Sequence, residues 1–132
     1  MKFKSKNIIE LKPENFNIKL KKIVHPSLDG TKKAMVAYVA PWCGYCVKFK
    51  PIYEDVGELL GGSFPLFYMD CDKYSEFSRR KLNINGFPTV LYINTEGKPY
   101  KKYTNERSWK VMINDICKEA KVCSSKNLSS IK

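Results

Sequence analysis

Residues 42–46 read Trp42-Cys43-Gly44-Tyr45-Cys46, and these two cysteines separated by two residues are the most informative feature of the chain. The apolar run before them, residues 35–41, predicts a buried strand. After Cys46 the apolar residues change to helical spacing: Val47, Phe49, Ile52, Tyr53, Val56, Leu59 and Leu60. The sequence therefore predicts that the cysteine pair lies where a strand passes into a helix.

This position favours redox chemistry. The first turn of a helix has unpaired backbone N–H groups and the positive end of the helix dipole, and both stabilise a thiolate at Cys43. Cys46, about one turn further on, is within reach of Cys43, so the pair can form, attack and release disulfides. A Cys-x-x-Cys pair is also half of a zinc site, but the remaining candidate ligands include no second pair of that spacing: His25, Cys71, Cys117 and Cys123. We therefore expect a redox pair, with no metal and no cofactor.

Residues 40–46 resemble the active-site loop of the thioredoxin superfamily, and their start, Ala-Pro-Trp-Cys-Gly, is closer to the protein disulfide isomerase branch than to bacterial thioredoxin. Further similarities follow in the family's order: Ile9-Glu10-Leu11, Glu14-Asn15-Phe16, Pro51, Asp70-Cys71-Asp72, Gly86-Phe87-Pro88-Thr89 and Tyr103-Thr104-Asn105-Glu106-Arg107. The resemblance covers about residues 8–120. It implies an α/β thioredoxin fold, a central mixed β-sheet flanked by helices in the order βαβαβαββα.

Apolar spacing and turn residues predict the individual elements. We expect strands at residues 8–11, 33–40, 64–70, 89–94 and 99–103, and helices at residues 14–24, 43–60, 73–82 and 106–121. Gly61-Gly62 should end the second helix, the segment 95–98 should form a hairpin turn, and Asn105 should cap the last helix. Length predicts a single domain, residues 1–132, with a core over about 8–121 and frayed ends.

The formal net charge is +11, from 24 basic and 13 acidic residues. The basic residues are mostly scattered lysines without a nucleic-acid-binding motif, so we expect no nucleic acid partner and at most a mild preference for acidic partners. No apolar run is long enough for a membrane span, and the ends carry neither a secretory nor a retention signal. We expect a cytoplasmic protein, unless the chain is a trimmed piece of a secretory-pathway protein.

Three cysteines lie outside the motif. Cys71 closes an apolar run and is expected to be a small buried residue. Cys117 shares one helix face with apolar residues, which is core spacing. Cys123 lies six residues later, a rise of about 9 Å in a continuous helix, so a Cys117–Cys123 disulfide requires the helix to end before Cys123. We favour the alternative, a free and exposed Cys123 that could link two chains as a dimer.

The resemblance implies roles for the residues around the pair. Cys43 would be the attacking nucleophile, Cys46 the resolving thiol, and Arg107 a catalytic residue that approaches Cys46 and assists its deprotonation. The substrate-binding residues would be Trp42, Gly44, Tyr45, Phe87 and Pro88. The bond before Pro88 would be cis. From the residues alone, Trp42 can also be a core residue, Pro88 a trans loop proline and Arg107 a solvent-facing charge.

Three positions depart from the family pattern. The buried acid that usually precedes the first cysteine by six residues is Ala37 here, and the lysine two residues before the aspartate that ends the third strand is Tyr68. Losing both together avoids an unpaired buried charge, but it also removes the usual proton acceptor for Cys46. Tyr45 replaces the histidine or proline common between the cysteines, and it cannot stabilise a thiolate by charge.

These observations predict a thiol–disulfide oxidoreductase of the isomerase or oxidase type, acting on protein thiols and disulfides through residues 43–46. Two alternatives stay open. One is a thioredoxin-like reductant that receives electrons from a reductase or from glutathione. The other is a non-enzymatic thioredoxin-fold module whose cysteines serve binding or assembly, although a pure binding module does not need Cys43, Cys46, Trp42 and Pro88 all intact.

Overall fold

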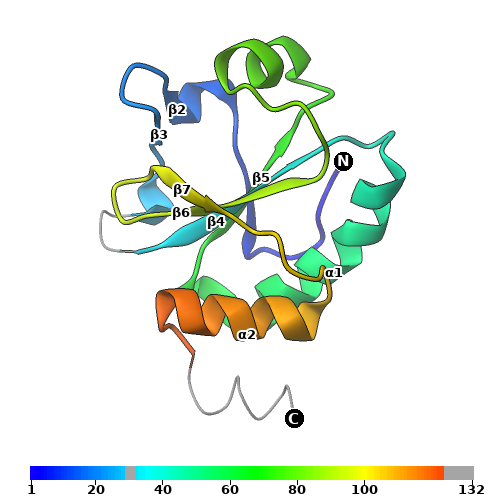
Figure 1. Ribbon diagram of the computed structural model, residues 1–132, viewed down its shortest axis with the longest axis vertical. Coiled ribbons are helices and arrows are strands. Elements are labelled where there is room, and N and C mark those ends of the chain that lie inside the picture. Colours follow the sequence, from blue (N-terminus) through cyan, green and yellow to red (C-terminus); the bar gives the residue numbers. More distant parts are fainter. Residues whose placement is uncertain (29–31, 124–132) are drawn as a thin grey trace.

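The computed structural model describes residues 1–28 and 32–123. Within them, five strands form one mixed β-sheet in the order β1-β5-β4-β6-β7 (Figure 1). The strands are β1 (Ile8–Glu10), β4 (Ala34–Val39), β5 (Leu66–Asp70), β6 (Thr89–Ile93) and β7 (Pro99–Lys102). β5 runs parallel to β1 and to β4, whereas β6 is antiparallel to β4 and to β7. This sheet confirms the predicted fold class.

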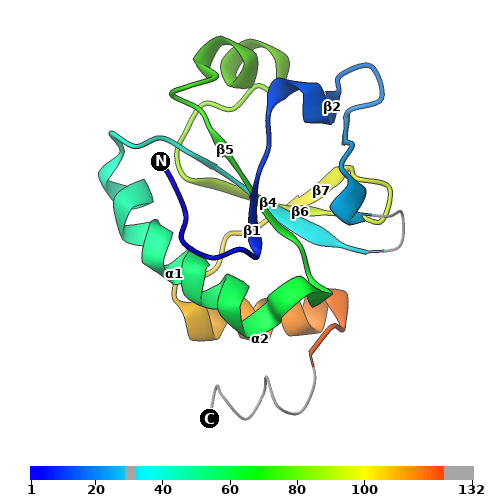
Figure 2. The same cartoon turned by 180° about the vertical axis from the view of Figure 1, so that it is seen from behind.

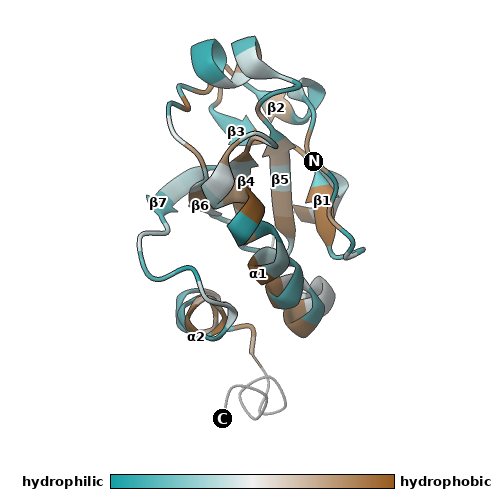
Figure 3. Cartoon of the chain, turned by 90° about the vertical axis from the view of Figure 1, so that its right-hand side faces the viewer, coloured by the Kyte–Doolittle hydropathy of each residue, from teal (hydrophilic) through white to brown (hydrophobic). Residues whose placement is uncertain are grey.

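Two layers of helices and loops cover the sheet. Helices α1 (Gly44–Leu60) and α2 (Trp109–Ala120) lie on one face (Figures 1 and 2). The other face is covered by the short strands β2 (Phe16–Asn17) and β3 (Lys22–Ile23) and by the π-helix η4 (Phe77–Lys81). All six residues of β4 are therefore buried, and their side chains alternate between two apolar cores. Figure 3 shows β4 and β5 as apolar strands at the centre of the molecule.

Helix α1 begins and ends where the sequence predicts. Cys43 is its N-cap residue, with extended backbone angles, and the helix follows β4 after only a few residues. At its other end, Gly61 adopts a φ of +60° that side-chain-bearing residues rarely adopt, and its N–H donates to the carbonyl of Gly57. Inside the helix, the Tyr53 hydroxyl donates to the Phe67 carbonyl at 2.8 Å and joins α1 to β5. Three short 3-10 helices complete the helical elements of the described residues: η1 (Pro13–Asn15), η2 (Pro26–Leu28) and η3 (Gly61–Ser63).

The predicted helix at residues 14–24 is wrong, because this segment forms η1 and the β2–β3 hairpin. The prediction depended on four apolar residues at helical spacing. In the hairpin, two of them, Phe16 and Ile23, are directly opposite each other, while Leu20 and Val24 are about half exposed. The same apolar residues therefore satisfy a hairpin as well as a helix.

Local hydrogen bonds explain why the hairpin forms. The Asn17 side-chain oxygen accepts a hydrogen bond from the Leu20 N–H at 3.0 Å, and Lys21 has a left-handed φ of 54°, so the segment turns instead of continuing as a helix. The Ile23 N–H then donates to the Gly97 carbonyl at 2.7 Å, in the predicted turn between β6 and β7. Gly97 has a φ of +85°, and a Cβ there would collide with the Ile23 backbone, so this contact requires glycine.

The last helix begins later than predicted. Ser108, not Asn105, is its N-cap residue, and the Ser108 hydroxyl accepts a hydrogen bond from the Val111 N–H at 3.4 Å. The Asn105 side chain instead accepts from the Glu106 N–H and donates to the Asp115 carboxylate. Both residue types are good caps, so the sequence pattern alone does not distinguish the two positions.

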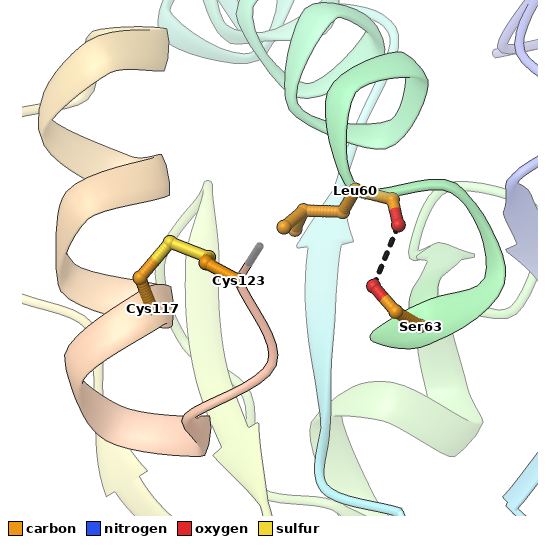
Figure 4. The surroundings of a disulfide bond; sticks show 4 residues. All are labelled: Leu60, Ser63, Cys117 and Cys123. Atoms are coloured by element: carbon orange, nitrogen blue, oxygen red, sulfur yellow. Dashed lines mark hydrogen bonds between the residues drawn. A yellow bond between two sulfur atoms is a disulfide. The ribbon is translucent and has the colours of Figure 1, made fainter. Parts of the chain in front are cut away.

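The same helix ends before Cys123, and this allows Cys123 to form a disulfide with Cys117. α2 stops at Ala120, and Lys121 adopts a left-handed φ of 54° that turns the chain back. Cys117 and Cys123 are thereby 5.1 Å apart at their Cα atoms and form a disulfide, beside the end of α1 at Leu60 (Figure 4). The expectation of a free Cys123 that links two chains is wrong, because it assumed that the helix continued. Cys71 is buried, as predicted.

Candidate active site

The two motif cysteines occupy different environments although they are one turn apart. Cys43 lies at the start of α1 and keeps 9% of its surface exposed, whereas Cys46 is completely buried. Both are free thiols in the structure. The Cys43 carbonyl accepts the first helical hydrogen bond from the Val47 N–H at 3.0 Å, so the helix holds the cysteine in place through its backbone. Only Cys43 can meet a disulfide from outside.

The surroundings of Cys43 favour its thiolate. Partial burial acts against the charged form, but hydrogen bonds from the Cys46 and Tyr45 backbone N–H groups, the Cys46 thiol and the charge of Arg107 outweigh it. The net effect lowers the pKa of Cys43 below that of an ordinary cysteine. Position at the helix start thus produces the activated thiol that the sequence predicts.

The opposite holds for Cys46. Burial raises the pKa of its thiol to about 12; a hydrogen bond from the Ala40 backbone acts against this rise, and the neighbouring Cys43 adds to it. That backbone contact is a hydrogen bond from the Ala40 N–H to the Cys46 sulfur, at 3.5 Å. Cys46 therefore stays protonated at neutral pH until Cys43 has reacted.

The predicted residues of the substrate surface gather around Cys43. The Phe87–Pro88 bond is cis, as expected, and the Cys43 thiol donates to the Phe87 carbonyl at 3.5 Å. Trp42 is 68% exposed, which excludes the alternative of a core tryptophan. Its ring meets the Phe87 ring edge-on, with centroids 5.7 Å apart, and its Nε1 donates to the Asp72 carboxylate at 3.0 Å.

Sequence reasoning assigned no role to Asp72. It follows the end of β5, and the loop there brings its carboxylate to Trp42, which is thirty residues away in the chain. Only the parallel pairing of β4 and β5 makes this contact foreseeable, because it brings the carboxyl ends of both strands to the same edge of the sheet. Asp72 orients the indole ring that forms one side of the approach to Cys43.

A cavity of about 240 Å³ extends from Trp42 and Phe87 along the loop after β5. Buried Cys71 lies in its wall, together with Arg79 and Asn85, neither of which the sequence analysis singled out. The cavity reaches the two residues, Trp42 and Phe87, that lie beside Cys43. Within the described residues, no group of three or more His, Cys, Asp or Glu side chains is arranged to hold a metal ion.

The sequence model of the family described as Thioredoxin matches residues 7–118. This chain belongs to the thioredoxin family. Its cysteine pair has the arrangement of a thiol–disulfide oxidoreductase.

Relatives of two kinds share the thioredoxin-family sequence. The chain is 32% identical over 119 residues to Protein disulfide-isomerase 1 of Dictyostelium discoideum, covering 88% of this chain and 31% of that protein. It is 31% identical over 94 residues to Thioredoxin of Borreliella burgdorferi, covering 69% of this chain and 80% of that protein. The solved structure of human ERp44 form I superposes with a TM-score of 0.71 at 23% identity, over 90% of this chain and 30% of that one, and supports the fold. The chain thus spans about a third of the isomerase relative.

Two departures from the thioredoxin-family pattern lie next to each other. Ala37 and Tyr68 are direct partners across β4 and β5, and both belong to the core that contains Cys46. Burial raises the pKa of Tyr68 to about 12, so it is neutral at physiological pH, and its ring packs against Phe3 with centroids 4.5 Å apart. Aromatic packing therefore occupies the place of a buried ion pair.

Arg107 lies on the Cys43 side of the site in this thioredoxin-family domain. Its guanidinium is 6.0 Å from the centre of the Tyr45 ring, which is 67% exposed. Its charge contributes to the lowered pKa of Cys43.

Among the described residues, no helix combines the length and the apolar character that crossing a membrane requires.

Proposed function

We propose that this chain is a thiol–disulfide oxidoreductase that acts on protein substrates, with residues 8–121 as one thioredoxin-like unit. The observation that carries the proposal is the contrast within the pair: Cys43 keeps 9% of its surface exposed and has a lowered pKa, whereas Cys46 is completely buried and has a raised pKa. One thiol is ready to attack and the other is protected until it is needed.

The proposed cycle has two exchanges. The Cys43 thiolate attacks one sulfur of a substrate disulfide, the substrate S–S bond breaks, and the other substrate sulfur leaves as a thiolate that takes up a proton. Cys46 then loses its proton to solvent and attacks the Cys43 sulfur of the mixed disulfide, which breaks that bond and releases the second substrate sulfur as a thiolate that takes up a proton. The substrate gains two electrons and two protons, and the enzyme becomes the Cys43–Cys46 disulfide. Run in reverse, the same steps oxidise a substrate dithiol.

The substrate would lie across a shallow apolar surface around Cys43. Trp42 and Tyr45, close to Cys43 in the chain, carry exposed aromatic rings, and the Phe87 carbonyl accepts a hydrogen bond from the Cys43 thiol. Gly44 has free space around it, since an added Cβ meets no atom within 4 Å. We propose that glycine is used here to let the substrate backbone approach the cysteine closely.

Two assays test the function and its direction. Reduction of insulin by dithiothreitol with catalytic amounts of the protein tests thiol–disulfide exchange, and reactivation of reduced, unfolded ribonuclease in a glutathione buffer tests oxidation and isomerisation. A reduction potential near the isomerase value of about −180 mV favours the oxidising role, and one near the thioredoxin value of about −270 mV favours a reductant. Activity in neither assay would support a binding or assembly module and refute the proposal.

A further inference from the structure

The β2–β3 hairpin encloses an apolar cavity on the sheet face opposite α1 and α2. We call it the hairpin groove. It has a volume of about 480 Å³, and its apolar wall includes Phe16, Ile18, Ile23, Leu82 and Leu91. Protein sites for small molecules or side chains typically have such volumes and such apolar linings with a few polar groups. The groove exists because residues 14–24 form a hairpin instead of the predicted helix.

The rim of the groove is cationic. Lys21, Lys22 and Lys81 all line it, and within the described residues none of the three forms an ion pair with a carboxylate. Two rim residues, Lys21 and Asn83, have left-handed φ values of 54° and 59°. The charge of the rim is complementary to an acidic ligand.

Apolar surface continues beyond the cavity. Ile18, which lines the cavity, is 39% exposed, and Leu20 in the same hairpin is 51% exposed. The buried side chain of Ile84 lines the hairpin groove and also the 240 Å³ cavity that begins at Trp42. The two cavities therefore have one lining residue in common, which places the hairpin groove next to the cavity beside Trp42 and Phe87.

We propose that the hairpin groove binds an acidic segment of the polypeptide substrate, with one bulky apolar side chain in the cavity and flanking carboxylates on Lys21, Lys22 and Lys81. The proposal rests on the proposed function for the identity of the ligand as a substrate. It explains how a protein with net charge +11 would select among disulfide-containing chains. Binding in the groove raises the local concentration of the substrate disulfide at Cys43.

Binding is tested without any thiol chemistry. The probe is a dye-labelled, cysteine-free peptide in which Phe-Leu is flanked by two aspartates on each side, and a second peptide carries lysines in place of the aspartates. We expect fluorescence anisotropy to detect binding of the acidic peptide only. Reversing two rim charges, Lys22→Glu with Lys81→Glu, should weaken it by about tenfold or more, since two attractions become repulsions. Ile18→Ser should weaken it by a smaller factor.

A matched control reverses the charge of two lysines outside the hairpin groove. Lys110→Glu with Lys118→Glu alters two exposed lysines of α2, on the other face of the sheet, and should leave binding within about twofold. Equal weakening by both pairs would show nonspecific charge attraction and overturn the proposal. Absence of acidic-peptide binding would also overturn the proposal. So would binding of octanoate, a small apolar carboxylate, in the groove when the peptide does not bind.

A kinetic arm connects the groove to the active site. With a disulfide-linked substrate that carries the acidic segment, Lys22→Glu with Lys81→Glu should raise KM and leave kcat unchanged. Reduction of a small disulfide such as oxidised glutathione should not change. If Cys43 reduces neither substrate, the function proposal fails, while the peptide titration still decides whether the groove binds acidic segments.

Discussion

The molecule has two cysteine pairs. One pair lies at the start of helix α1, and the other lies at the end of helix α2. Cys43 and Cys46 begin α1 as free thiols, whereas Cys117 and Cys123 form a disulfide at the end of α2. A helix start offers N–H groups and positive potential to a thiolate, and a helix end offers neither. The same side-chain chemistry therefore serves reversible exchange at one end and a fixed crosslink at the other.

The largest expected effect is the loss of activity on changing Cys43. Cys43→Ser should reduce insulin turnover by about a thousandfold or more, to the uncatalysed background, because a hydroxyl is not a nucleophile toward disulfides at neutral pH. Cys46→Ser should accumulate mixed disulfides that non-reducing gels detect. The matched change in the other pair, Cys117→Ser with Cys123→Ser, should keep activity within about twofold. Comparable loss in that variant would contradict the division between the pairs.

The second effect is the selectivity of alkylation in the reduced protein. With a pKa of about 12, only about one Cys46 thiol in 10⁵ is ionised at pH 7, whereas Cys43 has a lowered pKa and a much larger thiolate fraction. Iodoacetamide should therefore modify Cys43 first, by a factor of about a hundred or more. The rate of Cys43 alkylation should rise with pH and level off at a lower pH than that of an ordinary cysteine thiol. Mass spectrometry that finds Cys46 labelled first would refute this assignment.

The part of the molecule that carries the chemistry was the easier part to predict. The uninterrupted apolar run of β4 and the apolar spacing after Cys46 fix a strand followed by a helix, and together they place Cys43 at the helix start. Three of the predicted surface residues, Trp42, Tyr45 and Phe87, indeed gather around that cysteine. These contacts follow from the fold once the motif and the sheet order are known.

The errors have specific physical causes. The β2–β3 hairpin was missed because Phe16 and Ile23 fit a helix face and a cross-strand pair equally well, and the deciding contact with Gly97 is distant in sequence. The Cys117–Cys123 disulfide was considered but not favoured, because it depends on whether α2 stops at residue 120 or a few residues later. A sequence pattern predicts that a helix exists more reliably than it predicts the residue at which the helix ends. It therefore cannot decide whether a disulfide forms between cysteines on the two sides of that end.

The third prediction concerns that disulfide. Removing it by Cys117→Ala with Cys123→Ala should lower the free energy of unfolding by about 2 kcal/mol, from the chain entropy of closing a short loop. Urea unfolding at neutral pH, with the active-site pair kept oxidised in both proteins, measures the difference. An unchanged midpoint and slope would mean that the crosslink changes the free energies of the native and the unfolded protein equally, which would contradict this prediction. Cys71→Ala in the buried core is a useful comparison, since it changes a cysteine without changing a crosslink.

The smallest effect is expected from Arg107, and it shows on which cysteine the arginine acts. Its charge lowers the pKa of Cys43, so Arg107→Ala should raise that pKa and reduce the thiolate fraction at pH 6–7. The attack on a substrate disulfide should slow by at most about fivefold, because exposed charges contribute about 1 kcal/mol or less.

The pH dependence separates this role from assistance to Cys46. Above the Cys43 pKa the thiol is ionised in both proteins, so the difference in attack rate between Arg107→Ala and the parent should vanish as pH rises. Arg107→Lys keeps the charge but loses the planar guanidinium over Tyr45, and its rate should lie close to that of the parent. Stopped-flow kinetics can resolve attack from the release step, in which Cys46 must lose its proton. If Arg107→Ala slows release and leaves attack unchanged, the arginine moves toward Cys46 during the cycle, and its position beside Tyr45 belongs to the resting state alone.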